Sequence, residues 1–556
     1  MTHWSGTKKI TVAVLVTVVL VLFGTMLQDA YSFGVDDSFI FYRYAENIAA
    51  GKGFVFNAGE PAGEGFTSWL WTLMLAASHW MGIHIIQASK ILGILFHLLG
   101  AGLVFLVVQL LLAKERHSAS SQVSVGAYDY DSVAPLFGGL VAAVFLLNYR
   151  LIAHSVSGME TSLYVFTILL LTYLTTRALL ADSTALQWWW ILALTTTCAF
   201  WVRPEGIVAG GIALLAMAIA HWRALLKPRV WFYVLGGLVV PVLVFILIKV
   251  LVFGYPLPHS YYHKLIVIRS EYNDSLRHLL QFISAYGWLM VMAFISAGYA
   301  ILKQKKYLYL FYTVFFMAMT AIYLFFYPVM NYLHRFYIPY LPLLLVMLVP
   351  VFSLMARALV RSQYRHYRPV LLLLVFVLLG VRMNGQMGYT QKVVHGWSTL
   401  VNPAISRALL GRVMADLPAN MVVANSEMGV IPYYSGLTCI DMAGLTDPVI
   451  AHSGLTMAYL ETRHVDLILF PRDVQKITPA QWQTYTINYK DVFLSRRFKE
   501  SFQFIGAYPA WTNGPRQYYL YANHTSPRFD AVRQWWQRYE TRASRPATKL
   551  GSLNDK

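Results

Sequence analysis

The sequence predicts a polytopic α-helical membrane protein of about eleven transmembrane helices, with an α/β domain outside the cytoplasm at its C-terminal end. Three observations predict this class. Of the 556 residues, 57% are hydrophobic and only 13% are charged, whereas a soluble protein carries about 25% charged residues. Eleven mostly apolar stretches divide the chain before residue 383. After that point, Pro, Asn, Asp and Trp occur at the frequencies of soluble proteins.

The apolar stretches set the number of predicted spans. Several reach the roughly 20 residues that a spanning helix needs, while the third, fifth, sixth and eleventh are short. No small-residue cleavage site and soluble domain follow the first stretch, so we expect it to be a retained anchor. The stretches lie near 10–28, 87–112, 134–148, 161–181, 187–201, 206–221, 231–252, 281–302, 307–328, 338–356 and 369–383.

The net charge of +18 is distributed as a membrane topology predicts. With eleven spans, all of the strongly basic gaps lie on the side of the N-terminus, as expected of cytoplasmic loops. The positive charge therefore does not indicate nucleic-acid binding. The basic gaps contain Lys8 and Lys9, Lys114 and Arg116, Arg223, Lys227 and Arg229, Lys303, Lys305 and Lys306, and Arg357, Arg361, Arg365 and Arg368.

The first outer loop, about 29–86, is the longest gap between spans. Ile40, Tyr44 and Ile48 recur every four residues, with Arg43 and other polar residues on the opposite face. This period predicts an amphipathic helix lying along the membrane interface, ended by the glycines at 51 and 53. A second apolar, Trp-rich stretch covers residues 67–80, and its aromatic residues fit an interfacial belt.

The C-terminal region, 384–556, is predicted to be an extracytoplasmic α/β domain, whereas residues 1–383 form the transmembrane domain. Apolar runs at 421–424, 465–470 and 518–521 predict strands, and 407–416 predicts a helix. The polar tail from Thr541 is predicted to be disordered. The two cysteines, Cys198 and Cys439, lie in different regions without metal-ligand spacing, so neither a bridge between them nor a metal site is expected.

Two adjacent acids, Asp36 and Asp37, lie at the outer end of the first predicted span. A carboxylate at a helix N-terminus can cap the helix, although one residue suffices for that. The second interpretation is chemical: a carboxylate here could take a proton from an acceptor hydroxyl, or bind a divalent ion beside a phosphate. Glu64 and Glu160 face the same compartment. Glu64 belongs either to a plain loop before helix caps at Thr67 or Ser68 or to a site, and Glu160 either caps the fourth span or forms a wall of the site.

Other outer gaps contain cations and aromatic residues. Arg203 and Glu205 form a tight turn in which they could pair with each other. Lys249 lies inside the seventh stretch, where a charge costs about 2.5–3.5 kcal/mol at mid-bilayer, so it either snorkels or faces a polar cavity. The remaining candidates could hold a lipid phosphate: His259, Tyr262, Lys264, His334 and Arg335.

The sequence has no motif for nucleotide chemistry. It contains no P-loop, no GxGxxG after a strand and no GxSxG elbow. An outward-facing transferase would therefore need a substrate that arrives already activated. A lipid-linked phosphosugar meets that need, because its polyprenyl phosphate leaving group stays in the bilayer.

Several segments resemble the first outer loop of the GT-C polytopic glycosyltransferases, and most closely the cell-wall arabinofuranosyltransferases that add terminal β-(1→2) residues. In the first loop, these are Asp36 to Ile40, Arg43 to Asn47, Gly51 to Asn57 and Gly63 to Trp71. Where the family pattern has Val-Glu-Gly, this chain has Gly63-Glu64-Gly65 after Ala62. Later segments also look similar: Ser157 to Thr161, Arg203 to Gly206, Tyr255 to Pro258, Arg335 and Phe336, and Gly436 through Ile440 to Asp447.

This resemblance implies an activity and a location. The family uses polyprenyl-phosphoryl sugars as donors on the outer side of the membrane, here the cytoplasmic (inner) membrane of a bacterium. One of Asp36 and Asp37 would be the general base, Glu64 and Glu160 would line the site, and Arg203 and Glu205 would form a supporting turn. No cofactor is required, although a divalent cation would be compatible. The acceptor would be an envelope glycan, a lipid-linked glycan or a surface protein.

Two other hypotheses remain open from the sequence. A transporter or lipid flippase would place ionisable residues and broken helices near the bilayer midplane. In this sequence the ionisable residues gather at the outer ends of the predicted spans. A non-enzymatic envelope scaffold would bind glycan through its outer domain. Its candidate stacking residues, which core burial explains equally well, are Trp482, Trp511, Trp535 and Trp536.

Overall fold

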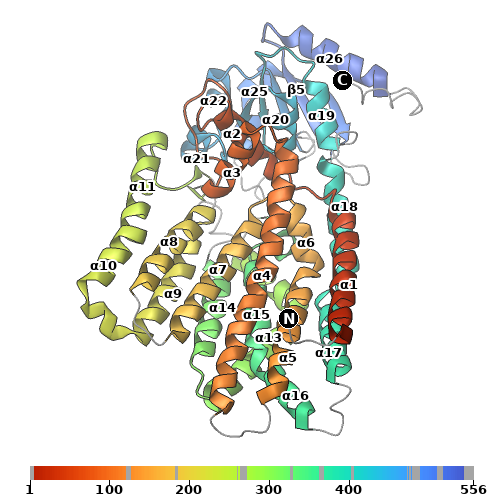
Figure 1. Ribbon diagram of the computed structural model, residues 1–556. Helices are drawn as coiled ribbons and strands as arrows, with labels where there is room; N and C mark the ends of the chain where they lie inside the picture. The colour runs from red at the N-terminus through yellow and green to blue at the C-terminus, as the bar shows by residue number, and fades with distance from the viewer. Residues whose placement is uncertain are drawn as a thin grey trace.

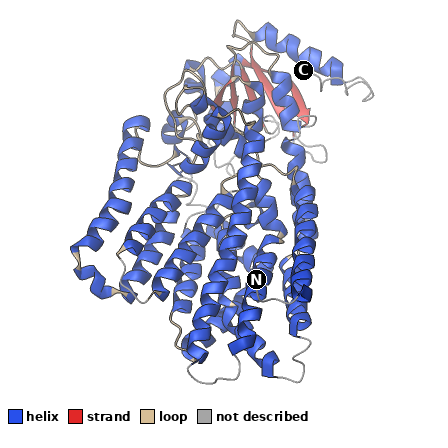
Figure 2. Cartoon of the chain, in the orientation of Figure 1, coloured by secondary structure: helices blue, strands red, loops and turns tan. Residues whose placement is uncertain are grey.

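In the computed structural model, a long helical bundle carries a five-stranded sheet domain at one end (Figures 1 and 2). Helices α2 (Ser38–Ala49) and α3 (Trp69–Trp80) lie between the bundle and this domain. The structure describes residues 6–120, 127–181, 186–259, 261–262, 272–325, 330–361, 368–401, 406–471, 474, 477–478, 489–509 and 517–543.

Each of the eleven predicted apolar stretches lies largely in helix. The bundle contains α1 (Gly6–Ala30), α4 (Ile85–Ser120), α5 (Ala127–Leu146), α6 (Tyr149–Val156), α7 (Thr161–Leu180), α8 (Gln187–Val202), α9 (Gly206–Ala220), α10 (Pro228–Val234), α11 (Val240–Phe253), α13 (Tyr272–Leu302), α14 (Leu308–Phe325), α15 (Leu341–Met347), α16 (Val349–Arg361), α17 (Arg368–Met383) and α18 (Met387–Val401).

The protein is a multi-pass membrane protein. Among the described residues, seven helical segments are long and apolar enough to cross a bilayer, or up to nine if two bent pairs each count as one span. Helices α8 and α9 have only 16 and 15 residues, fewer than the roughly 20 needed to cross the hydrocarbon core. The predicted number of eleven crossings therefore stays a prediction.

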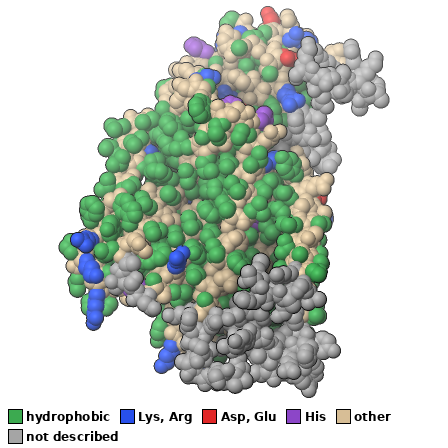
Figure 3. Space-filling model, viewed as in Figure 1, with side chains coloured by type: hydrophobic (Ala, Val, Ile, Leu, Met, Phe, Trp, Pro, Cys, Tyr) green, Lys and Arg blue, Asp and Glu red, His purple; other side chains and the backbone are tan. Residues whose placement is uncertain are grey.

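The surface of the bundle is apolar along its length (Figure 3). On α11, for example, Leu243, Leu247 and Leu251 are exposed by 59%, 56% and 75%, as expected of side chains in contact with lipid. In this view, Lys and Arg side chains are grouped at the end of the bundle opposite the sheet domain, and others lie on the sheet domain itself (Figure 3). The described basic gaps, which contain Arg223 and Lys303, are exposed at the end opposite the sheet domain.

The two bent helix pairs of the described residues meet inside the bundle. The axis bends by 59° between α5 and α6 and by 46° between α17 and α18. Asn384, at the second break, accepts a hydrogen bond from the Tyr149 amide at 2.8 Å and donates to the Leu147 carbonyl at 2.9 Å. The Asn148 side chain caps α6 by accepting from the Leu151 amide. These side chains satisfy backbone groups that the breaks leave without helical partners.

The C-terminal region forms the predicted α/β domain. Its sheet has the order β2-β1-β3-β5-β4, in which the first three strands are parallel and the β3–β5 and β5–β4 pairs are antiparallel. The central strand β3 is buried along its whole length, which explains its continuous apolar sequence. The strands are β1 (Val422–Asn425), β2 (Thr438–Asp441), β3 (Leu467–Phe470), β4 (Phe502–Pro509) and β5 (Gln517–Asn523).

The three predicted strands and the predicted helix, now α19 (Ser406–Met414), are confirmed. Strands β2 and β4 were not predicted, because their short runs contain Cys, Asp, Gln and Gly rather than a clear alternation. Cys198 and Cys439 are free, as expected. The predicted disordered tail begins inside α26 (Phe529–Ala543), and its remainder lies outside the described residues.

The sheet domain packs on the bundle through a shared apolar core. Buried side chains on one face of the sheet, including Val423 and Leu467, belong to the same cluster as the buried residues of α2, α4 and α7. Trp535 and Trp536 are buried in this cluster, and Trp535 donates to the Val413 carbonyl at 2.7 Å. These two residues are therefore not available for stacking on a glycan. Trp482 and Trp511 lie outside the described residues.

Candidate active site

Helix α2 forms where the four-residue period predicts it, but its polar face is covered. Asn47 is buried and donates to the carbonyls of Val55 and Phe56 at 2.9 and 3.1 Å. Arg43 donates to the carbonyls of Pro432 and Leu437 in the C-terminal domain at 2.5 and 2.7 Å. The predicted helix is confirmed, and its position along the membrane interface stays a prediction. The C-terminal domain packs over its polar face.

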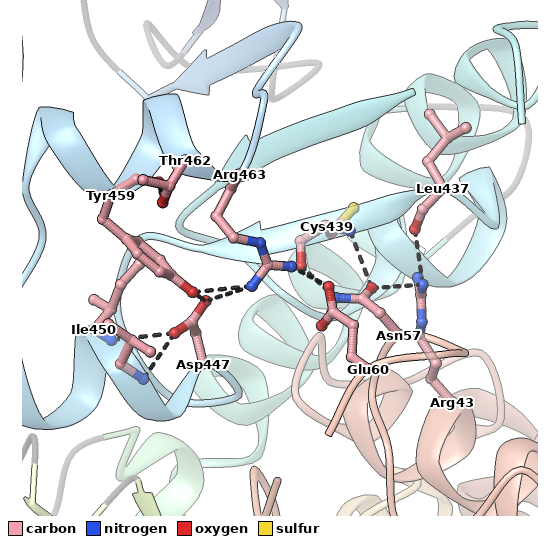
Figure 4. A network of polar contacts seen from close by, with 11 residues as sticks. Arg43, Asn57, Glu60, Leu437, Cys439, Asp447, Ile450, Tyr459, Thr462 and Arg463 are labelled. Atoms are coloured by element: carbon pink, nitrogen blue, oxygen red, sulfur yellow. Dashed lines mark hydrogen bonds and ion pairs between the residues drawn. The ribbon is translucent and has the colours of Figure 1, made fainter. Parts of the chain in front are cut away.

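A polar network fastens the first loop to the C-terminal domain (Figure 4). Asn57 pairs with the backbone of Cys439 in both directions, accepting at 3.0 Å and donating at 2.9 Å. Glu60, further along the loop, pairs with Arg463. Asp447 accepts from Tyr459 at 2.8 Å and caps α21 (Pro448–Ser453). The loop and the domain are therefore held together by hydrogen bonds with defined geometry.

Gly65 marks a close approach between the loop and the domain. A Cβ atom there would lie 2.6 Å from Thr446 Cγ2, 2.9 Å from Tyr44 Oη and 3.1 Å from Leu445 O. We expect Gly65→Ala to force the two parts away from each other and to lower the melting temperature by several degrees, since overpacking costs about 1–3 kcal/mol. Gly63→Ala is the matched control, because its nearest contact would be 3.4 Å. Equal melting temperatures for the two variants, measured by tryptophan fluorescence, would contradict this packing.

Asp36 is one of the contacts between the loop and the domain. It is buried, and its Oδ1 accepts from the Val430 amide at 3.1 Å and lies 3.3 Å from Arg407 Nη1. Arg407 pairs in turn with Glu427. A Cβ atom at Gly429 would lie 2.0 Å from the Asp36 carbonyl oxygen. Asp36 therefore has a structural partner on the C-terminal domain, which the sequence did not indicate.

Asp37 lies at the position that precedes α2, but its side chain makes no capping hydrogen bond to the helix. It is partly exposed. The adjacent backbone joins the loop before α7, since the Val35 amide donates to the Ser157 carbonyl at 3.2 Å. Trp71 of α3 donates to the Gly158 carbonyl at 3.1 Å. The two aspartates therefore lie beside the loop that leads to Glu160.

Glu160, Arg203 and Arg335 form a buried ion-pair cluster, which we call the arginine cluster. Arg335 Nη2 lies 2.7 Å from Glu160 Oε1, and Arg203 Nη1 lies 3.9 Å from the same oxygen. Arg203 Nε pairs with Glu205 Oε1 at 2.8 Å, as the tight turn suggests. Glu205 also accepts from the Tyr323 hydroxyl at 2.8 Å. Glu160 makes no capping hydrogen bond to α7, so its contacts favour the site interpretation over the capping one.

The arginine cluster has unused hydrogen-bonding capacity. Among the described residues, Glu160 Oε2, Arg203 Nη1 and Arg335 Nε are buried and have no hydrogen-bond partner. Buried polar atoms nearly always have a partner, and leaving one without any costs about 1–3 kcal/mol. Two guanidinium donors and one carboxylate oxygen therefore suit a polar ligand at this position.

Glu64 and Lys249 form a second buried pair. Lys249 Nζ lies 3.0 Å from Glu64 Oε2, and the side chains are exposed by only 6% and 1%. Trp69 donates to Glu64 Oε1 at 2.5 Å. Burial raises the pKa of Glu64 to about 7, although the charge of Lys249 acts in the opposite direction. Lys249 therefore does not snorkel, and the polar-cavity alternative fits its position, because Glu64 supplies a partner inside the protein.

His259 lies next to this pair, in an aromatic group. Its amide donates to the Glu64 carbonyl at 3.1 Å, and neither ring nitrogen has a hydrogen-bond partner in the described structure. His452 of the C-terminal domain stacks on Tyr255 at 3.7 Å and contacts the rings of His259 and Tyr262. Burial lowers the pKa of His259 to about 4. The predicted aromatic, basic segment is thus in contact with the C-terminal domain.

The lowered pKa of His259 predicts a pH effect on stability. As the pH falls from about 6.5 towards 4, the unfolded chain binds a proton at this residue that the folded chain does not, so stability should decrease. We expect His259→Gln to reduce this loss, seen as a flatter dependence of melting temperature on pH between 7 and 4. His84→Gln, at an exposed histidine, is the control, and an unchanged slope in His259→Gln would contradict the prediction.

The side chain of His334 lies away from the arginine cluster. His334 has a φ of +61°, and its ring contacts Phe282 and Tyr286 rather than the arginine cluster. Such a backbone conformation is strained for a non-glycine residue and occurs often at functional sites. Lys264 lies outside the described residues. The predicted phosphate-binding residues are therefore not one group: Arg335 and Lys249 are paired with glutamates, while His334 faces another part of the bundle.

No candidate metal centre was found in the described part of the chain, where no three His, Cys, Asp or Glu side chains lie close enough together to hold an ion. The divalent cation that the sequence left open stays untested.

Comparison with known proteins supplies the context for this geometry. Residues 398–521 match a family described as a domain of unknown function (DUF8728). The terminal β-(1→2)-arabinofuranosyltransferase of Mycobacterium tuberculosis (strain ATCC 25618 / H37Rv) is 31% identical over 230 residues, which cover 40% of this chain and 33% of that protein. The chain thus spans about a third of the length of this relative.

The similarity of fold extends over nearly the whole chain. ArnT from Cupriavidus metallidurans in the apo state superposes with a TM-score of 0.55 at 12% identity, over 93% of this chain and 98% of ArnT. The same protein bound to undecaprenyl phosphate gives 0.53 at 14% identity, over 94% and 99%. The Archaeoglobus fulgidus oligosaccharyltransferase tethered with an acceptor peptide gives 0.51 at 9% identity, over 91% and 74%.

The chain has the GT-C fold. The superposition on ArnT leaves little of this chain unmatched, so the bundle, the first loop and the C-terminal domain are all part of the shared architecture. Within it, the predicted site residues that are described lie at the end of the bundle nearest the sheet domain, with Glu64, Glu160, Arg203, Lys249 and Arg335 in two buried ion-pair groups.

Several functional candidates escaped the reasoning from sequence. Arg43 and Asn57 lie in segments that carry the family resemblance, but nothing marked them as contacts to the C-terminal domain. Arg407 lies at the start of a predicted helix, where an arginine is unremarkable. Its role follows only from its distance to Asp36.

Proposed function

We propose that this GT-C chain is a glycosyltransferase that moves a sugar from a polyprenyl-phosphate donor to a hydroxyl of a cell-envelope acceptor. Arabinofuranose is our choice of sugar, because the M. tuberculosis relative is an arabinofuranosyltransferase. The observation that carries the proposal is the arginine cluster, with its unpartnered buried atoms, beside the loop that holds Asp36 and Asp37. A carboxylate and a set of cations are the two parts that the reaction needs.

The reaction inverts the anomeric carbon in a single displacement. The acceptor hydroxyl attacks that carbon while one of Asp36 and Asp37 takes its proton. The bond between the sugar and the phosphate oxygen breaks, and the lipid phosphate leaves with the additional negative charge. Arg203 Nη1 and Arg335 Nε, which have no hydrogen-bond partner, are the donors that we assign to this charge. Their interaction strengthens as the bond breaks, as catalysis requires.

The sidedness of the reaction is part of the proposal. The described basic loops lie at the end of the bundle opposite the sheet domain (Figure 3). Because basic loops are retained in the cytoplasm, we place the first loop and the C-terminal domain on the outer face of the cytoplasmic membrane of a bacterium. There the donor sugar is attached to a lipid, and the acceptor is an envelope glycan, a lipid-linked glycan or a surface protein.

The test is a reaction with purified protein and defined donors. Polyprenyl-phosphoryl arabinofuranose and a second polyprenyl-phosphoryl sugar are incubated in parallel with an envelope glycan acceptor, and the released polyprenyl phosphate is measured. We expect release that depends on the acceptor and is faster with the arabinosyl donor. Release from neither donor, combined with movement of intact donor across a vesicle membrane, would instead support the flippase alternative. Faster release with the second sugar would retain the reaction class and overturn the choice of arabinofuranose.

A further inference from the structure

A second arginine pair lies apart from the arginine cluster, in a cavity between the two broken helix pairs. This cavity has a volume of about 50 Å³ and is lined by Arg150, Ser284, Arg382, Gly385 and Gln386, among others. Arg150 is the second residue of α6, and Gly385 and Gln386 lie in the break between α17 and α18. Along α6, Arg150 is about 10 Å from Ser157 at a rise of 1.5 Å per residue.

Arg150 is buried without a counter-charge. It is 5% exposed, and its guanidinium donates to Gln386 Oε1 at 2.5 Å and Thr390 Oγ1 at 3.3 Å. It also lies 5.3 Å from the centre of the Tyr286 ring. Arg382 is exposed at the cavity and lies 5.7 Å from the Trp288 ring centre. Within the described part of the chain, neither guanidinium has a carboxylate partner.

The other buried arginines show how unusual this is. Arg203 and Arg335 each pair with Glu160, and Arg407 pairs with Asp36 and Glu427. A buried cation without an anion is strongly unfavourable, because protein groups replace its hydration only in part. Among the described residues that line the cavity, none is Asp or Glu.

Tyr286, whose ring contacts Arg150, has an unused donor. The Tyr286 hydroxyl is buried and has no hydrogen-bond partner in the described structure, while its ring lies beside Arg150. Ser284 and Gln386 supply further polar groups to the lining. A small cavity lined by two arginines, a serine and a glutamine, with no acid among its described lining residues, has the composition of an anion site. Arginine forms forked hydrogen bonds to two oxygens of one phosphate.

We propose that Arg150 and Arg382 bind a phosphate group, carried either by an anionic membrane lipid or by free phosphate. This site is separate from the one that we assign to sugar transfer, since the two have no residue in common. Phosphate between α6, α13 and the break after α17 would neutralise Arg150 and join the two broken helix pairs. The ligand would therefore stabilise the bundle.

The test compares phosphate binding by the wild-type protein and by variants, each purified and freed of lipid. Melting temperatures are measured with added phosphatidylglycerol, with inorganic phosphate, and with phosphatidylcholine as the lipid that carries no net charge. We expect wild type to be stabilised by phosphatidylglycerol or by inorganic phosphate but not by phosphatidylcholine. Which of the two acts identifies the source of the phosphate. The double variant Arg150→Gln/Arg382→Gln should lose this shift. The control variant Arg223→Gln should keep it, because Arg223 is exposed at the end of the bundle opposite the sheet domain.

Equal shifts in wild type and the double variant, or no shift with either phosphate compound, would overturn the proposal. If the double variant does not fold, Arg382→Gln alone serves, because that side chain is exposed and donates no hydrogen bond in the described structure. It should bind the active compound about tenfold more weakly, which corresponds to about 1.4 kcal/mol. Because no sugar donor is used, the outcome does not depend on whether the chain is a glycosyltransferase.

Discussion

Asp37→Asn is expected to lower the rate of sugar transfer by about 10²–10⁴-fold, which is the usual contribution of a general base. The side chain is partly exposed and asparagine has nearly the same shape as aspartate, so the melting temperature should change less than in Asp36→Asn. The measurement is the initial rate of polyprenyl phosphate release by the purified variant. A large loss of rate at unchanged stability would assign a chemical role to this carboxylate.

Asp36→Asn is the matched variant, because it changes the adjacent carboxylate in the same way. Asp36 pairs with Arg407 and accepts from the Val430 amide, so this variant should also weaken the contact between the first loop and the C-terminal domain. We expect a lower melting temperature together with any loss of rate. If Asp36→Asn lost the rate while Asp37→Asn kept it, Asp36 would be the base. Wild-type rates for both variants would contradict the proposed reaction.

Arg335→Met is expected to have the largest effect on stability. It leaves Glu160 buried with only a distant partner, since Arg203 Nη1 is 3.9 Å away while Arg335 Nη2 is at 2.7 Å. Breaking a buried ion pair in this way costs about 3–5 kcal/mol. Thermal unfolding followed by tryptophan fluorescence should show a clear decrease in melting temperature, and sugar transfer should be lost as well.

The double variant Glu160→Gln/Arg335→Met separates the two effects. Removing both charges of the pair should recover much of the melting temperature, since a neutral pair carries no uncompensated buried charge. Sugar transfer should not recover, because a donor assigned to the phosphate is still missing. Recovery of both properties would show that the pair is structural only, and recovery of neither would show that the Arg335 side chain is needed for packing.

Much of the fold follows from local features of the sequence. Eleven apolar stretches lie largely in helix, because hydrophobic length and period depend only on neighbouring residues. The same holds for α2, whose period of four is visible from Ile40 to Ile48, and for β3, whose apolar run is continuous. Strands β2 and β4 were missed, because their short and mixed sequences form strands only where neighbouring strands offer hydrogen bonds.

The sequence predicted which residues belong to the candidate site. It did not predict which of them form ion pairs with each other. Asp36, Glu64, Glu160 and Lys249 attract attention in the sequence because charges are rare near apolar spans. Their partners were not visible there. Lys249 had two interpretations, and only the position of Glu64, 3.0 Å away, shows that it faces inward.

The amino-acid sequence by itself determined that this is a multi-pass helical protein, that an α/β domain follows the helices, and which acids and cations deserve study. Apolar length, period and composition are properties of short segments, so they can be read without the fold. The tertiary structure alone decided which charges meet. Arg335 reaches Glu160 across 175 residues, and the Val430 amide reaches Asp36 across 394. Electrostatic energy depends on distance in space, and no local pattern records the packing that brings such distant segments together.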